Sequence, residues 1–142
     1  MILYLGTSSL IKFYVEEEYS DIVRRWIREA EIVSTCRVAY AEVISSLEIR
    51  LKQDDLSKRD YDRIVRRFSL DWPEYASVDF DDREAGRFIK KYGLKRFNAI
   101  HLSAAKLIMR GGQNGMSLTF SSADPSLRNA ADSEGLDVLH FC

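Results

Sequence analysis

The chain of 142 residues is long enough to bury the core of one domain, and it carries 21 basic against 22 acidic residues. This near-neutral balance argues against a protein that binds nucleic acid mainly through its net charge, but it allows a local basic groove. Neither a secretion-signal pattern nor a long apolar span is seen, which favours a cytoplasmic protein without a membrane segment. Cys36 and Cys142 lack metal-like or redox-like spacing, which indicates a reducing compartment; a disulfide between them is the alternative.

An apolar run over residues 1–5 predicts a buried strand, and the polar stretch 6–9 after it predicts a turn into a helix over 10–15. Ser20 suits the N-cap of a second helix that ends near Ala30, and residues 31–34 suit a short strand. A strand that ends in a small polar turn reaches the carboxyl edge of a sheet, where α/β proteins build their sites. The residue at position 6 therefore matters most for function, and it is Gly6.

A long helix is expected over residues 37–52, and it carries two apolar stripes on opposite sides. One stripe contains Tyr40, Ile44, Leu47 and Leu51, and the other contains Val38, Glu42, Ser45 and Ile49. A helix that is apolar on two sides is covered on two sides, here by the sheet and by another helix or a partner. Glu42 lies within the second stripe, which sets it apart from a solvated surface carboxylate, the alternative interpretation of this residue.

The remaining elements alternate between helix and strand. We expect a helix from Ser57 to Trp72, a strand over 75–78, a helix from Asp81 to Gly93, a buried helix over 98–110, a turn over 111–115, a strand over 116–120, a helix from Pro125 to about 133 and a strand over 136–141. This alternation predicts a single three-layer α/β/α domain over 1–142 with a central, mainly parallel five-stranded sheet. The basic residues between Arg59 and Arg67 are interpreted as a solvated helix face, with RNA contact as the alternative.

Four positions converge at one sheet edge if the first and fourth strands are neighbours. They are Gly6 and Asp124 at the ends of those strands, Glu42 on the two-sided helix, and Asn98 in the first turn of the buried helix. Acidic oxygens gathered there suit Mg²⁺ or Mn²⁺, which can activate water for displacement at a phosphate. Asn98 and Asp124 also suit helix N-caps, and the capping and site roles of Asp124 are compatible. His101 is interpreted as a packed histidine rather than a metal ligand.

Several segments together resemble the PIN domain family, and within it the VapC-type toxin ribonucleases of toxin–antitoxin systems. They are residues 1–12, Tyr40-Ala-Glu-Val43, Phe97-Asn-Ala-Ile-His-Leu102, Ser122-Ala-Asp124 and Ala130-Ala131. The resemblance covers nearly the whole chain. It implies a PIN-like fold, an endoribonuclease that uses Mg²⁺ or Mn²⁺, a homodimer, and inhibition by an antitoxin. By position it implies catalytic roles for Gly6, Glu42, Asn98 and Asp124, metal ligation by Glu42 and Asp124, and orienting roles for Ser8 and Ser122.

Two of these positions depart from the family, because Gly6 and Asn98 stand where it has aspartate. Asparagine still offers a neutral oxygen, whereas glycine offers no side chain. The resemblance therefore implies weak or absent metal binding and impaired RNA cleavage. Two alternatives stay open: a non-catalytic PIN module that binds RNA or an antitoxin, and an active nuclease that uses Glu42, Asp124 and the Asn98 oxygen. A flavodoxin-like or response-regulator-like module fits the alternation but not the residues, since no phosphate-binding loop is present.

Overall fold

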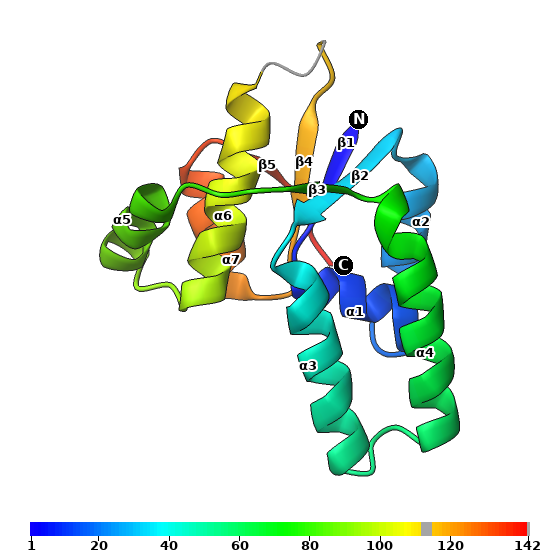
Figure 1. The fold of residues 1–142 in the computed structure, drawn as a ribbon. Coiled ribbons are helices and arrows are strands. Elements are labelled where there is room, and N and C mark those ends of the chain that lie inside the picture. The colour runs from blue at the N-terminus through cyan, green and yellow to red at the C-terminus, as the bar shows by residue number, and fades with distance from the viewer. Residues whose placement is uncertain (112–114, 142) are drawn as a thin grey trace.

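The computed structural model describes residues 1–111 and 115–141, and these form a sheet of five parallel strands in the order β3-β2-β1-β4-β5 (Figure 1). The strands are β1 (Ile2–Leu5), β2 (Ile32–Cys36), β3 (Ala76–Val78), β4 (Leu118–Ser121) and β5 (Asp137–Val138). The predicted three-layer α/β/α architecture is confirmed, and every strand pair in the described residues is parallel. Ile2 pairs with Leu118, so the first and fourth strands are neighbours at the centre of the sheet, as the site requires.

Helices cover both faces of the sheet. They are α1 (Thr7–Tyr14), α2 (Ser20–Glu29), α3 (Ala39–Lys52), α4 (Lys58–Asp71), the 3₁₀ turn η1 (Trp72–Glu74), α5 (Asp82–Tyr92), α6 (Arg96–Arg110) and α7 (Pro125–Ser133). Successive side chains of a strand point to opposite faces, so β1 supplies two cores. Leu3 and Leu5 pack with α1 to α4, while Ile2 and Tyr4 pack with α5, α6 and α7. Figure 1 shows these two groups of helices on either side of the sheet.

The helix α3, which the sequence predicts to be apolar on two sides, is covered on one side only. On one side of α3, Tyr40 stacks on Phe68 of α4 with ring centroids 5.1 Å apart, and α3 and α4 form the helical hairpin at the bottom of Figure 1. The other stripe, with Glu42 and Ser45, lines an open groove. The expected second cover is therefore absent from the described part of this single chain. None of the described helices combines the length and the apolar character that a membrane span needs.

Several predicted boundaries differ from the structure. The sequence pattern predicts the last strand over 136–141, but only Asp137–Val138 pairs with β4. Ser20 is the first residue of α2 rather than its N-cap, because Tyr19 takes that position; the Ser20 hydroxyl instead accepts from the Glu17 amide and donates to the Val15 carbonyl. The expected turn over 111–115 lies partly outside the described residues. The alternative disulfide between Cys36 and Cys142 also falls partly outside the described residues, because Cys142 is not among them. Cys36 is buried.

Candidate functional site

The site lies where β1 and β4 end side by side. Gly6 follows β1 directly, and its amide donates to the Ser121 carbonyl at the end of β4 at 2.9 Å. Asp124 follows β4 and is the N-cap of α7. The parallel pairing of two central strands therefore brings residues from opposite ends of the chain to one sheet edge.

Gly6 has no backbone reason to be glycine. Its φ of −67° and ψ of 164° lie in the extended region that any residue adopts. A Cβ at this position would meet the Ser121 carbonyl oxygen at 3.4 Å and the Ser122 Cβ at 3.6 Å, which are ordinary contacts. An aspartate at position 6 is therefore compatible with this backbone, and what glycine changes is the chemistry of the edge.

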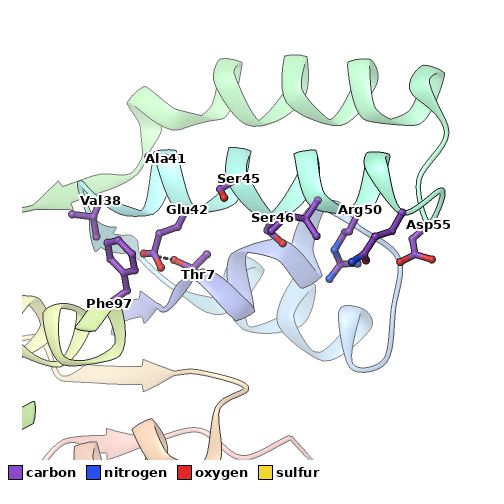
Figure 2. A pocket seen from close by; sticks show the side chains of 11 residues that line it. Thr7, Val38, Ala41, Glu42, Ser45, Ser46, Arg50, Asp55 and Phe97 are labelled. Carbon is purple, nitrogen blue, oxygen red and sulfur yellow. Dashed lines mark hydrogen bonds between the residues drawn. The ribbon is translucent and has the colours of Figure 1, made fainter. Parts of the chain in front are cut away.

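Glu42, which projects from the first turn of α3, is held by two hydrogen-bond partners, of which Figure 2 shows Thr7. The Thr7 hydroxyl donates to its Oε1 at 2.8 Å, and the same oxygen lies 2.8 Å from Nε2 of His101. The carboxylate is largely enclosed, with 18% of its side chain exposed, and the His101 side chain is 2% exposed. One oxygen of Glu42 is thus committed to protein donors.

His101 links Glu42 to the core through a second hydrogen bond. Its Nδ1 lies 2.7 Å from the hydroxyl of Tyr4. Burial, followed by the nearby Cys36 and Glu42, raises the pKa of Tyr4 well above its usual range, so this hydroxyl keeps its proton. The assignment that satisfies every group has Tyr4 donating to Nδ1 and Nε2–H donating to Glu42. The prediction of a packed histidine is confirmed, with a polar role that the sequence pattern did not indicate.

Both carboxylate oxygens of Asp124 accept hydrogen bonds. Its Oδ1 accepts from the Leu127 amide at 3.1 Å, which confirms the predicted N-cap, and its Oδ2 accepts from Nδ2 of Asn98 at 3.2 Å. The interpretation of Asn98 as an N-cap is wrong. Lys95 takes that position, so Asn98 lies in the first turn of α6 and its amide is free to reach across to Asp124.

The two serines of the predicted site lie together. Ser8 Oγ is 3.5 Å from Ser122 Oγ and accepts from the Ala123 amide at 2.9 Å. Ser122 Oγ accepts from the Asp124 amide at 3.1 Å. Both hydroxyls thereby fix the turn that presents Asp124, which is consistent with an orienting role.

Two open grooves meet at Glu42 and Phe97. One, of about 820 Å³, is lined by Glu42, Lys95, Arg96, Phe97, Asn98 and Asp124. The other, of about 930 Å³, runs along α3 from Val38 and Thr7 to Arg50 and Asp55 (Figure 2). Of the four predicted catalytic positions, Glu42, Asn98 and Asp124 therefore line one groove, whereas Gly6 is buried at the sheet edge and does not line it.

The residues present do not fit the acidic metal centre that the resemblance implies. Throughout residues 1–111 and 115–141, no three His, Cys, Asp or Glu side chains come together in a way that could hold a metal ion. Both oxygens of Asp124 and one oxygen of Glu42 already accept hydrogen bonds, and Gly6 offers no ligand. Divalent cations such as Mg²⁺ are held by free carboxylate oxygens together with water.

Tyr4, Thr7 and His101 were missed as members of the site. Tyr4 and His101 are 97 residues apart, and Thr7 and Glu42 are 35 apart, so no local period connects them. The available signals were weak: a tyrosine inside an apolar strand, and a histidine inside an apolar helix. Each of these side chains carries a polar atom that needs a hydrogen-bond partner when it is buried.

Comparison with known proteins shows which family and which solved structures this chain is similar to. The model of the PIN domain matches residues 3–110. Ribonuclease VapC46 from Mycobacterium tuberculosis is 28% identical over 137 residues, which span 96% of this chain and 95% of that protein. Two crystal structures share the fold: FitAcB from Neisseria gonorrhoeae (TM-score 0.69, 18% identity, 99% of this chain and 97% of that one) and PAE2754 from Pyrobaculum aerophilum (TM-score 0.66, 17% identity, 97% and 89%).

Proposed function

This chain belongs to the PIN domain family, and from that premise we propose that it is a VapC-type toxin ribonuclease by descent that keeps RNA binding but is impaired in metal-dependent cleavage. The family generally depends on a divalent metal ion. The relative VapC46 is named a ribonuclease, which supports RNA as the ligand of this chain.

One observation carries the proposed impairment. The Asn98 amide donates to Asp124 Oδ2 at 3.2 Å, at the position where the family has a second carboxylate. An amide beside a carboxylate forms a neutral-to-charged hydrogen bond that needs no cation, whereas two carboxylates at that distance repel each other unless a cation lies between them. With Gly6 also lacking a carboxylate, the site has lost about two of four negative charges and with them most of its attraction for Mg²⁺ or Mn²⁺.

Restoring the two aspartates tests this proposal. We expect the wild-type chain to leave RNA intact in Mn²⁺, and Gly6→Asp combined with Asn98→Asp to cleave it. The backbone at position 6 accepts the change, and the restored carboxylates recreate an acidic cluster. A bound metal ion stabilises transition-state charge by several kcal/mol, and each ~1.4 kcal/mol is tenfold in rate, so we expect a gain that is readily detectable. Growth arrest on expression is a second readout.

The matched control adds Asp124→Ala to the restored variant, which should abolish the gain. Wild-type cleavage that equals that of the restored variant and disappears in Asp124→Ala would contradict the impairment. It would instead support an active nuclease built on Glu42, Asp124 and the Asn98 oxygen.

The proposal extends to protein partners. A VapC-type chain pairs with a small antitoxin protein and forms a homodimer, and the open groove along α3 leaves a partly apolar face uncovered in the single chain. Co-expression with the open reading frame beside this one, followed by affinity purification, tests the antitoxin. Light scattering of the purified chain tests the homodimer; a monomer at all concentrations would exclude it.

A further inference from the structure

Phe97 is exposed at the meeting point of the two grooves. It lies in the first turn of α6, and its ring faces Val38 and Glu42 in Figure 2. Its side chain lines both grooves and is 43% exposed. Among the described residues, the other exposed large apolar side chains are aliphatic or methionine: Ile49, Leu70, Ile89, Leu107 and Met109. Core packing does not explain why this phenyl ring is exposed in the groove that Glu42 and Asn98 also line.

Two cationic residues precede Phe97 in the sequence and line one of its grooves. Lys95 and Arg96 immediately precede Phe97, are exposed, and line the groove that holds Asn98 and Asp124. Within the described part of the chain neither has an ion-pair partner, whereas three basic residues of α4 pair with acids on their own helix: Lys58, Arg63 and Arg67. Arg59 and Arg66 of α4 are also outside the ion pairs of the described residues, but no residue of α4 lines either groove. The cations that line the groove of Asn98 and Asp124 are Lys95 and Arg96.

We propose that Phe97 is a stacking platform for an unpaired base of RNA, with Lys95 and Arg96 on the phosphates that flank that base. The inference rests on the proposed function only in taking RNA as the ligand. A phenyl ring stacks on any base, but only when the face of that base is free of its neighbours. The carboxylates of Glu42 and Asp124 repel phosphate, so the backbone of a bound strand lies toward the two cations and its base toward the ring.

Fluorescence anisotropy in EDTA tests this arrangement, with a labelled RNA strand of about 12 nucleotides, alone and annealed to its complement. We expect Phe97→Leu to weaken binding of the single strand about 5- to 100-fold, and Phe97→Trp to keep it within about threefold. Leucine preserves an apolar side chain but removes the π face, which separates stacking from apolar docking. Leu70→Ala, at an exposed position outside both grooves, is the control for a general loss of surface and should bind as the wild type does.

The phosphate contacts are tested through salt dependence. Lys95→Gln should reduce the slope of log K against log salt by about 0.7, the value for one phosphate contact on a single strand. Circular dichroism melts of each variant establish that it is folded, since all the changed side chains are exposed.

The outcomes separate this inference from the proposed function. A wild-type chain that binds neither RNA form contradicts both. Tight wild-type binding that is unchanged in Phe97→Leu, or equal for single strand and duplex, overturns the stacking platform alone. A Phe97→Leu variant that binds RNA normally but no longer self-associates would show that the ring belongs to a protein interface instead.

Discussion

Asn98 and Asp124, separated by 26 residues, are joined by a hydrogen bond of 3.2 Å from the amide Nδ2 to the carboxylate Oδ2. The bond exists because α6 begins at Arg96, which leaves Asn98 in the first turn with its side chain toward the end of β4. Under the proposed function, this bond stands where a cation would bridge two carboxylates. The site is thus held together by the protein's own donors.

Reintroducing a charge at Asn98 should destabilise the chain when no metal ion is present. Asn98→Asp loses the hydrogen bond and places two carboxylates side by side, so we expect the free energy of unfolding at pH 7 in EDTA to fall by about 1–2 kcal/mol. Addition of Mn²⁺ should recover part of the loss. Urea unfolding measures both. Asn129→Asp, at an exposed position of α7, is the control and should change little. A loss that is equal at both positions would contradict the predicted repulsion.

Asp124 has a capping role that can be separated from its site role. Asp124→Ala removes the acceptors for the Leu127 amide and for the Asn98 side chain, and should lower the free energy of unfolding by about 1–3 kcal/mol. Asp124→Ser keeps a cap and should recover about 1 kcal/mol of that loss. Ser57→Ala removes the cap of α4, where the Ser57 hydroxyl accepts from the Asp60 amide at 3.1 Å, and should cost about 1 kcal/mol. If Asp124→Ala were neutral while Ser57→Ala was not, the carboxylate would not be acting as a cap.

The contact between Tyr4 and His101 should be energetically coupled. Tyr4→Phe removes the donor to Nδ1, and His101→Leu leaves the buried Tyr4 hydroxyl without this partner and removes a donor to Glu42. Each single change should lower the free energy of unfolding by about 1–3 kcal/mol. The double variant should lose less than the sum, with a coupling of about 0.5–3 kcal/mol. Chemical denaturation of the four proteins completes the cycle, and additive losses would rule out a direct bond.

Glu134 provides a test of pH dependence away from the site. Burial opposes its charge, but hydrogen bonds from Tyr92 and Lys91, with Lys106 nearby, lower the pKa of this carboxyl below its usual value. A carboxyl group whose pKa is lower in the folded state than in the unfolded state adds stability at pH values above the unfolded-state pKa. This added stability is lost as the pH falls through the folded-state pKa. Glu134→Gln should therefore be less stable than the wild type at pH 7, and the difference should disappear as the pH falls through the lowered folded-state pKa of Glu134. Glu29→Gln, exposed at the end of α2, is the control; a gap that persists in acid would contradict the assignment.

The sequence was most informative where local chemistry decides the structure. Alternating elements predicted the layers, and the pairing of Asp124 with Pro125 predicted the start of α7 correctly. The sequence was least informative where contacts between residues far apart in the chain decide the structure. Its residue type favoured Asn98 as the N-cap of α6. The helix instead begins at Arg96, three residues after Gly93, and no side chain caps it. The bonds of His101 depend on β1 lying beneath α6, which no helical period reveals.

Isothermal titration with Mn²⁺ tests the central claim most directly, which is that protein donors, rather than a cation, hold Glu42 and Asp124. The account predicts no saturable binding by the wild-type chain at millimolar Mn²⁺. It predicts at least about tenfold tighter binding, or ~1.4 kcal/mol, for the variant that combines Gly6→Asp with Asn98→Asp. Wild-type binding as tight as that of the restored variant, and abolished by Asp124→Ala, would contradict it.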